Sequence, residues 1–242
     1  MRNIKLILEY DGTDFVGWQT QAEGRTVQEE VTKVLREILQ EEVTIEGAGR
    51  TDSGVHARGQ VANFLTNSSL EMDSLFQALN GMLPLDVRIR SAREVSELFQ
   101  ARFHARARLY KYYISVKQQA IGRQYQWHVK YPLDVGSMKC AAELVTGEHD
   151  FSSFCNHAEE VEDRSCTVIV SRWSQSPRGL IYEVKANRFI HGMVRALVGT
   201  MVDIGRGHIP AGSFAEIIEA KDRSKAGMAA PAHGLCLEEV VY

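Results

Sequence analysis

The chain has 242 residues, a hydrophobic content of 44% and a formal net charge of −3 at pH 7. This length suits one large domain or two smaller ones, and the composition is ordinary for a soluble globular protein. No stretch approaches the about 20 apolar residues that a membrane span requires. Residues 1–5 lead into structure without a signal-peptide core. We therefore expect a cytoplasmic protein with no membrane partner.

The chain has four cysteines: Cys140, Cys155, Cys166 and Cys236. They form no C-x-x-C pair, and we interpret them as reduced thiols. A rival hypothesis gathers His149, Cys155, His157 and Cys166 into the zinc site of a metal-dependent hydrolase. Their spacing fits none of the common zinc templates. The chain also lacks a Walker loop, a dinucleotide glycine fingerprint and a two-histidine zinc helix. We expect no metal and no cofactor.

The net charge argues against a nucleic-acid partner, because Lys and Arg dominate binding to phosphates. The distribution of charge matters more. No Asp or Glu occurs in residues 98–133 or 184–202, which we call the basic segments. Their cations are Arg102, Arg106, Arg108, Lys111, Lys117, Arg123 and Lys130, then Lys185, Arg188 and Arg195. This segregation suits a protein with one RNA-binding face, although basic runs are as often only solvated surface.

In the first half, alternating apolar residues predict strands at 4–9, 43–48, 60–66 and 86–94. Helical spacing predicts helices at 26–40 and 72–81. Thr26 is the expected N-cap of the first helix, and Glu29 is placed to complete a capping box. The predicted order is β-α-β-β-α-β.

The second half repeats this order loosely. Strands are predicted at 108–116, 167–173, 180–186 and 235–241, and helices at 137–146, 189–204 and 214–221. We therefore predict an α+β protein of two ferredoxin-like halves, each a split βαβ arrangement, at residues 1–103 and 104–242. Their antiparallel sheets would lie side by side and leave a central cleft.

One loop of the first half, residues 49–57 with the sequence GRTDSGVHA, is rich in functional groups. Taken alone, Asp52 in its Thr-Asp-Ser-Gly context is most often a turn residue. Arg50 and His56 lie close by in sequence, and an adjacent guanidinium would keep the carboxylate ionised as a nucleophile or base. The loop lacks the second carboxylate that glycoside hydrolysis uses. A covalent or stabilising role is therefore favoured for Asp52.

Two further candidates lie in the second half. Alternation along strand 108–114 places Tyr110 and Tyr112 on one face, where an aromatic ring between cations can stack on an unpaired base. At least one of these tyrosines is expected to be a core residue. Arg195 lies in the predicted helix 189–204, where a single arginine is more often surface. The sequence leaves both orientations of Arg195 open.

These motifs together resemble the tRNA pseudouridine synthase A (TruA) family over nearly the whole chain. The matching segments, in order, are residues 10–19, 26–28, 47–61, 79–84, 108–112, 147–151, 189–195 and 230–235. The segment around Asp52 is the most specific of them. The loop at 155–164 has no clear family pattern.

The resemblance implies a pseudouridine synthase fold in which Asp52 is the catalytic nucleophile and Tyr110 stacks on the target uracil. It implies that Arg50 and Arg195 serve the active site, with Arg195 as the ionic partner of Asp52. It also implies a homodimer that modifies uridines 38–40 in the anticodon arm of tRNA. The alternative is a non-catalytic RNA-binding module, since paired sheets carrying aromatic and basic residues suffice for binding.

Overall fold

The computed structural model describes residues 1–155 and 163–242. The chain forms two compact units: unit 1 is Met1–Arg106 with Leu237–Tyr242, and unit 2 is Ala107–Cys236. The predicted halves are residues 1–103 and 104–242, so the main difference is that the end of the chain packs with unit 1. No helix among the described residues has the length and apolar character needed to cross a membrane.

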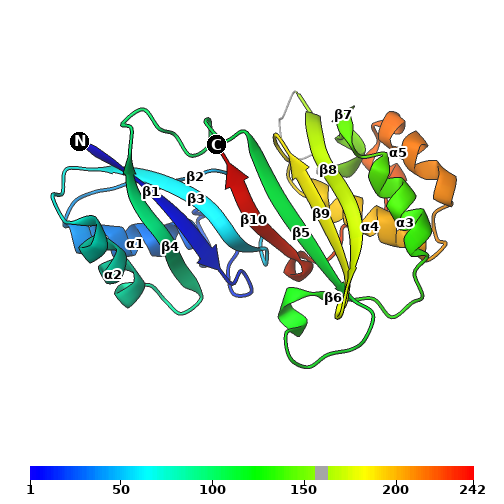
Figure 1. Ribbon diagram of the computed structural model, residues 1–242, viewed down its shortest axis with the longest axis horizontal. Coiled ribbons are helices and arrows are strands. Elements are labelled where there is room, and N and C mark those ends of the chain that lie inside the picture. The colour runs from blue at the N-terminus through cyan, green and yellow to red at the C-terminus, as the bar shows by residue number, and fades with distance from the viewer. Residues whose placement is uncertain (156–162) are drawn as a thin grey trace. The chain divides into compact units, whose positions relative to one another are not determined.

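Unit 1 alternates strands and helices in the predicted order (Figure 1). Its elements are β1 (Arg2–Tyr10), α1 (Val27–Leu39), β2 (Glu46–Gly47), β3 (His56–Thr66), α2 (Met72–Met82), β4 (Val87–Val95) and most of β10 (Leu235–Val241). The strands follow the spatial order β4-β1-β3-β10, and β2 also pairs with β3. The pairs β1–β3, β1–β4 and β2–β3 are antiparallel.

The apolar positions of β1 and α1 build the core of unit 1, as their spacing predicts. On β1, Ile4, Leu6 and Leu8 are fully buried in alternation. On α1 the buried residues are Val27, Val31, Val34 and Leu35. The hydroxyl of Thr26 accepts a hydrogen bond from the main-chain N–H of Glu29, which confirms Thr26 as the N-cap of this helix.

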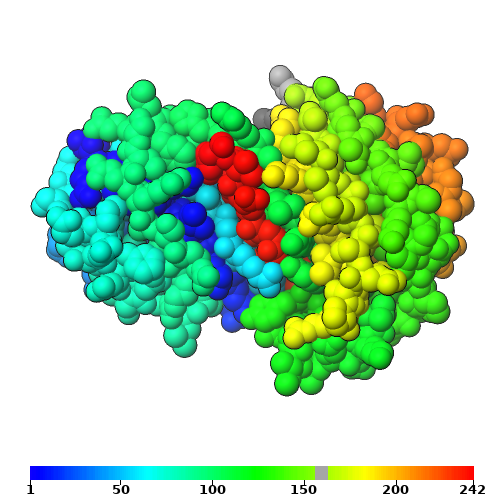
Figure 2. Space-filling view, viewed as in Figure 1, coloured from blue at the N-terminus to red at the C-terminus, as the bar shows by residue number. Residues whose placement is uncertain are grey.

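Unit 2 also combines a β-sheet with α-helices. Its elements are β5 (Ala107–Ser115), β6 (Trp127–His128), α3 (Val135–Glu143), β7 (Gly147–Asp150), β8 (Ser165–Ser176), β9 (Gly179–Ala186), α4 (Met193–Gly205) and α5 (Phe214–Ala220). The strands follow the order β5-β9-β8-β7. Strand β6 pairs with β5 in parallel, so this sheet is not wholly antiparallel. Figure 2 shows β8 and β9 at the surface of this unit, and Figure 1 shows α3, α4 and α5 grouped to the right of these strands.

Several element predictions differ from the structure. The predicted strand 43–48 pairs only at Glu46–Gly47, although Val43 and Ile45 are buried. Strands β6 and β7 have no counterpart among the predicted strands. Strand β3 begins at His56 rather than at residue 60. Helix α4 begins at Met193 rather than at residue 189, because Gly192 adopts a left-handed conformation with φ 76° that interrupts the helix.

Candidate functional site

The loop that carries Asp52 joins β2 to β3 and is fixed by hydrogen bonds to residues 10–18. Three of these bonds are Tyr10 Oη to Thr51 Oγ1 (2.8 Å), Trp18 N–H to Thr51 O (3.1 Å) and Gly54 N–H to Phe15 O (3.2 Å). Tyr10, Phe15 and Trp18 are buried, so water competes little for these bonds. The main chain on both sides of Asp52 therefore has a fixed course, while its side chain is half-buried.

Two glycines allow this close approach of the two main chains. A Cβ at Gly12 would lie 2.1 Å from the carbonyl oxygen of Val55. A Cβ at Gly17 would lie 2.7 Å from the carbonyl oxygen of Thr51, and Gly17 has φ 109°. Neither position admits a side chain without movement of the main chain. The sequence motif around Gly12 and Gly17 thus has a direct steric cause.

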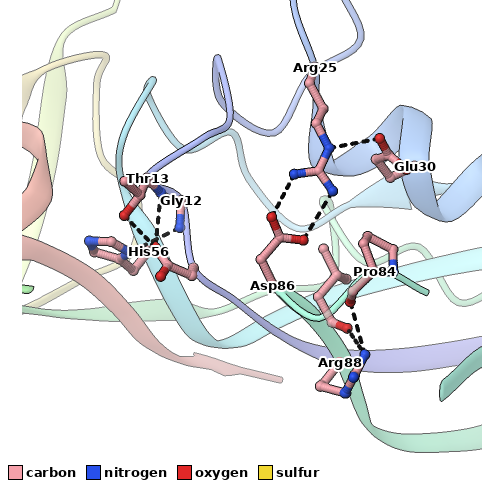
Figure 3. A network of polar contacts seen from close by, with 10 residues as sticks. Gly12, Thr13, Arg25, Glu30, His56, Pro84, Asp86 and Arg88 are labelled. Carbon is pink, nitrogen blue, oxygen red and sulfur yellow. Dashed lines mark hydrogen bonds and ion pairs between the residues drawn. The ribbon is translucent and has the colours of Figure 1, made fainter. Parts of the chain in front are cut away.

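Arg25 stabilises the segment 10–18 through contacts with Asp86 and Glu30 (Figure 3). Its guanidinium donates two hydrogen bonds to the carboxylate of Asp86, at 2.5 and 3.0 Å, and a third to Glu30 at 2.8 Å. The hydrogen bond to Asp86 raises the pKa of Arg25 above its usual value, although burial opposes this. The main-chain oxygen of Asp86 accepts from the N–H of Asp11. These contacts tie the turn at residues 11–13 to the start of β4.

Arg50 is exposed, and its Nε donates a hydrogen bond to Oε1 of Gln19 at 3.2 Å. The guanidinium is thus engaged with Gln19. That Arg50 keeps the carboxylate of Asp52 ionised stays a prediction.

Tyr110 and Arg195 both belong to unit 2, whereas Asp52 and Arg50 belong to unit 1. Tyr110 is 8% exposed, and Phe189 meets it edge to face with ring centroids 5.1 Å apart. Phe189 lies just before α4, and nothing in the sequence predicts its contact with Tyr110. An edge-to-face neighbour fixes the plane of a tyrosine ring. The orientation of Tyr110 is therefore set within unit 2.

Arg195 lies in the first turn of α4 and is half-buried, not on the outer surface. Its Nε donates to the carbonyl oxygen of Ala230 at 2.8 Å, and the N–H of Ala230 donates back to the carbonyl of Arg195. Nearby, the hydroxyl of Tyr112 donates to the carbonyl of Pro231. Burial raises the pKa of Tyr112 well above its usual range, and the charge of Arg195 lowers it by less.

Tyr112 is fully buried, which confirms the expectation that one tyrosine of this strand is core. A Cβ at Gly234 would lie 2.6 Å from the Tyr112 ring, so the segment 230–234 packs directly on it. In the sequence, only the family resemblance singles out this segment. Its contacts with Arg195 and Tyr112 are a tertiary feature with no local signal.

The basic segments are partly neutralised by acids from elsewhere in the chain. Lys111 lies 3.7 Å from a carboxylate oxygen of Glu183, and Arg188 lies 3.5 Å from one of Asp163. Lys117 and Arg123, in the segment between β5 and β6, are exposed. The charge available to an anionic partner is therefore smaller than the sequence count suggests.

The zinc hypothesis gains no support from the described residues. Within residues 1–155 and 163–242, no three His, Cys, Asp or Glu side chains are grouped to hold a metal ion. Nε2 of His149 lies 3.1 Å from the carbonyl of Thr146, and burial raises the pKa of Cys166 to about 11. Zinc binds the thiolate, which such a pKa disfavours. His157 and most of the loop 155–164 lie outside the described residues.

A hollow of about 470 Å³ opens in unit 1 beside β1 and β3. Glu41, Glu42, Thr66 and Phe99 are among the residues that line it, and none of the four predicted site residues does. The chemistry predicted for Asp52 therefore does not depend on this hollow.

Comparison with known proteins identifies a family. A family model described as tRNA pseudouridine synthase matches residues 6–104 and 141–242. Three full-length or nearly full-length relatives illustrate the similarity. The tRNA pseudouridine synthase A of Acetivibrio thermocellus is 41% identical over 100% of both chains. A protein of Clostridium perfringens named tRNA pseudouridine synthase A 2 is 42% identical over 100% of both chains. The tRNA pseudouridine synthase A of Halalkalibacterium halodurans is 43% identical over 97% of this chain and 90% of its own.

The α+β fold and the matched segments define an RNA-modifying isomerase. The chain belongs to the tRNA pseudouridine synthase family, whose members convert uridine in tRNA to pseudouridine. This membership confirms the resemblance found in the sequence and favours the enzyme over the non-catalytic RNA-binding module.

Proposed function

We propose that this protein isomerises uridines 38–40 in the anticodon arm of tRNA, with Asp52 as its catalytic residue. The observation that carries the proposal is the fixed course of the Asp52 loop. Its main chain is held by buried hydrogen bonds, yet the carboxylate is half-buried rather than enclosed. A reacting group needs both a fixed position and access to substrate.

The reaction sets clear physical requirements. The uridine must leave the base stack, at a cost of a few kcal/mol that is smallest in a loop or at a stem end. Stacking on Tyr110 offsets part of this cost. The bond from C1′ to N1 then breaks and a bond from C1′ to C5 forms. C5 loses a proton and N1 gains one, so that no atom is gained or lost overall.

Asp52 acts in its ionised form by one of two routes. It adds to the base, or it assists departure of the base at C1′, and both need the electron pair of a carboxylate. We propose that Arg195 is the cationic partner that favours ionisation of Asp52, and that Arg50 acts at the same site. The half-buried position of Arg195, with its Nε fixed on Ala230, supports a role beyond the solvated surface. That the substrate lies in a cleft between two ferredoxin-like halves stays a prediction.

Substitution of Asp52 by Asn tests the proposal. The Asp52→Asn variant should bind unmodified tRNA transcript with near-normal affinity and lose at least about a thousandfold in rate, because the amide is neither nucleophile nor base. Asp14→Asn is the matched control: it removes one exposed carboxylate from the same unit. Mapping of pseudouridine on the transcripts reads out both activity and position. Full activity of Asp52→Asn, or modification outside positions 38–40, would contradict the proposal.

We propose further that the enzyme is a homodimer, as the resemblance implies. Sedimentation equilibrium should give twice the mass of the 27.2 kDa chain at micromolar concentration. A monomer mass across that range would overturn this part of the proposal.

A further inference from the structure

His56 lies at the first position of β3, four residues after Asp52, and is 6% exposed. Its Nδ1 lies 2.9 Å from the main-chain nitrogen of Gly12 and 3.2 Å from Oδ1 of Asp11 (Figure 3). These two neighbours require opposite protonation states of Nδ1. The N–H of Gly12 only donates, so it needs a bare Nδ1, whereas a carboxylate only accepts and would need Nδ1 to carry a proton.

The other contacts of the two neighbours decide between these states. Oδ1 of Asp11 already accepts from the N–H of Thr13 at 3.0 Å and from its hydroxyl at 2.6 Å. The buried N–H of Gly12, in contrast, donates to Nδ1 of His56, and a buried donor that loses its acceptor destabilises the fold. The geometry therefore favours a neutral ring whose proton is on Nε2 and whose Nδ1 accepts from Gly12.

This hydrogen bond holds the C-terminal side of the Asp52 loop. The bonds of Thr51 to Tyr10 and Trp18 fix the loop before Asp52, and the bond from Gly12 to His56 fixes it after Asp52. Close packing at Gly12 also restricts movement of the loop, because the Cα of Gly12 faces the main-chain carbonyl of Val55. The carboxylate is thus placed by a loop that is tied at both ends to one segment.

We propose that His56 is a positioning residue for the pseudouridine reaction, and that it acts as the neutral Nε2–H tautomer through its bond to Gly12. The inference rests on the proposed role of Asp52. A displacement of a reacting group by about 1 Å can cost about a hundredfold in rate. Loss of the bond should therefore lower kcat and leave KM for tRNA nearly unchanged, because the bond is buried and is not itself a group offered to the RNA.

Three variants test the proposal. His56→Ala removes the acceptor, and its kcat should fall about 10- to 100-fold with KM within about threefold. His56→Asn places an amide oxygen near the position of Nδ1, and it should recover most of kcat. His104→Ala is the matched control. Nδ1 of His104 also accepts a main-chain N–H, that of Gln100 at 3.1 Å, but outside the Asp52 loop. Its kcat should stay within about twofold of the wild type.

Nitrogen NMR of histidine-labelled wild-type enzyme supplies an independent readout. His56 should show a pyridine-type signal at Nδ1 and a pyrrole-type signal at Nε2 at neutral pH. A protonated Nδ1, an unchanged kcat in folded His56→Ala, or an Asn variant as slow as the Ala variant would each overturn the proposal. Activity of Asp52→Asn would instead overturn the role of Asp52 itself, so the two failures are distinguishable.

Discussion

At the scale of single residues, Thr51 and His56 hold the Asp52 loop through hydrogen bonds to one earlier segment of the chain. The GRTDSGVHA segment is visible as a cluster of functional groups, and family resemblance assigns Asp52 a reaction. The anchoring partners lie about 40 residues earlier, at Tyr10, Gly12 and Trp18. A pairing over that distance leaves no local pattern, so only the folded structure reveals it.

Gly12 leads to a prediction at this scale. In Gly12→Ala the new Cβ would meet the carbonyl oxygen of Val55 at 2.1 Å, so the main chain must move. We expect the free energy of unfolding to fall by about 1–3 kcal/mol. The control is Gly81→Ala in α2, where the added Cβ meets nothing within 4 Å. That change should raise the free energy of unfolding by about 0.5–1 kcal/mol. Urea unfolding curves measure both, and a fully stable Gly12→Ala would refute the steric argument.

At the scale of elements, local patterns predict what local forces determine. Helix α1 follows from its apolar spacing and its Thr26 cap, both of which act within a few residues. Strand β10 has the bounds predicted from the sequence, Leu235–Val241. The sequence does not predict that most of β10 belongs to unit 1, because one of the strands that it pairs with, β3, lies about 180 positions earlier in the chain.

The predicted elements that differ from the structure do so because main-chain pairing depends on distant residues. Residues 43–48 alternate like a strand, but only Glu46 and Gly47 find partners on β3. Phe189 has helical spacing with Met193, yet Gly192 breaks the helix and Phe189 packs on Tyr110 instead. Apolar periodicity reports which residues are buried. It does not report whether their main-chain groups have a hydrogen-bonding partner.

At the scale of the whole molecule, charge distribution predicts how tRNA binding depends on salt. The slope of log K against log salt is negative, and its magnitude should fall by about 0.7–0.9 for every phosphate that the protein no longer binds. We expect such a reduction in Lys117→Ala and in Arg123→Ala, whose side chains are exposed in a basic segment. Lys33→Ala, an exposed lysine of α1, is the control and should keep the wild-type slope. Filter-binding titrations at several salt concentrations measure it, and unchanged slopes in both variants would contradict the basic-face hypothesis.

The sequence by itself determined the α+β class, most element positions, the family and the identity of Asp52 as the residue to test. These depend on local periodicity, capping and a motif whose residues lie within a few positions of one another. The tertiary structure decided which groups hold the Asp52 loop, that Tyr112 is core, that Arg195 is fixed on Ala230, and that His56 bonds to Gly12. Those contacts join residues about 35 to 120 positions apart, and hydrogen bonds over such distances exist only once the chain has folded.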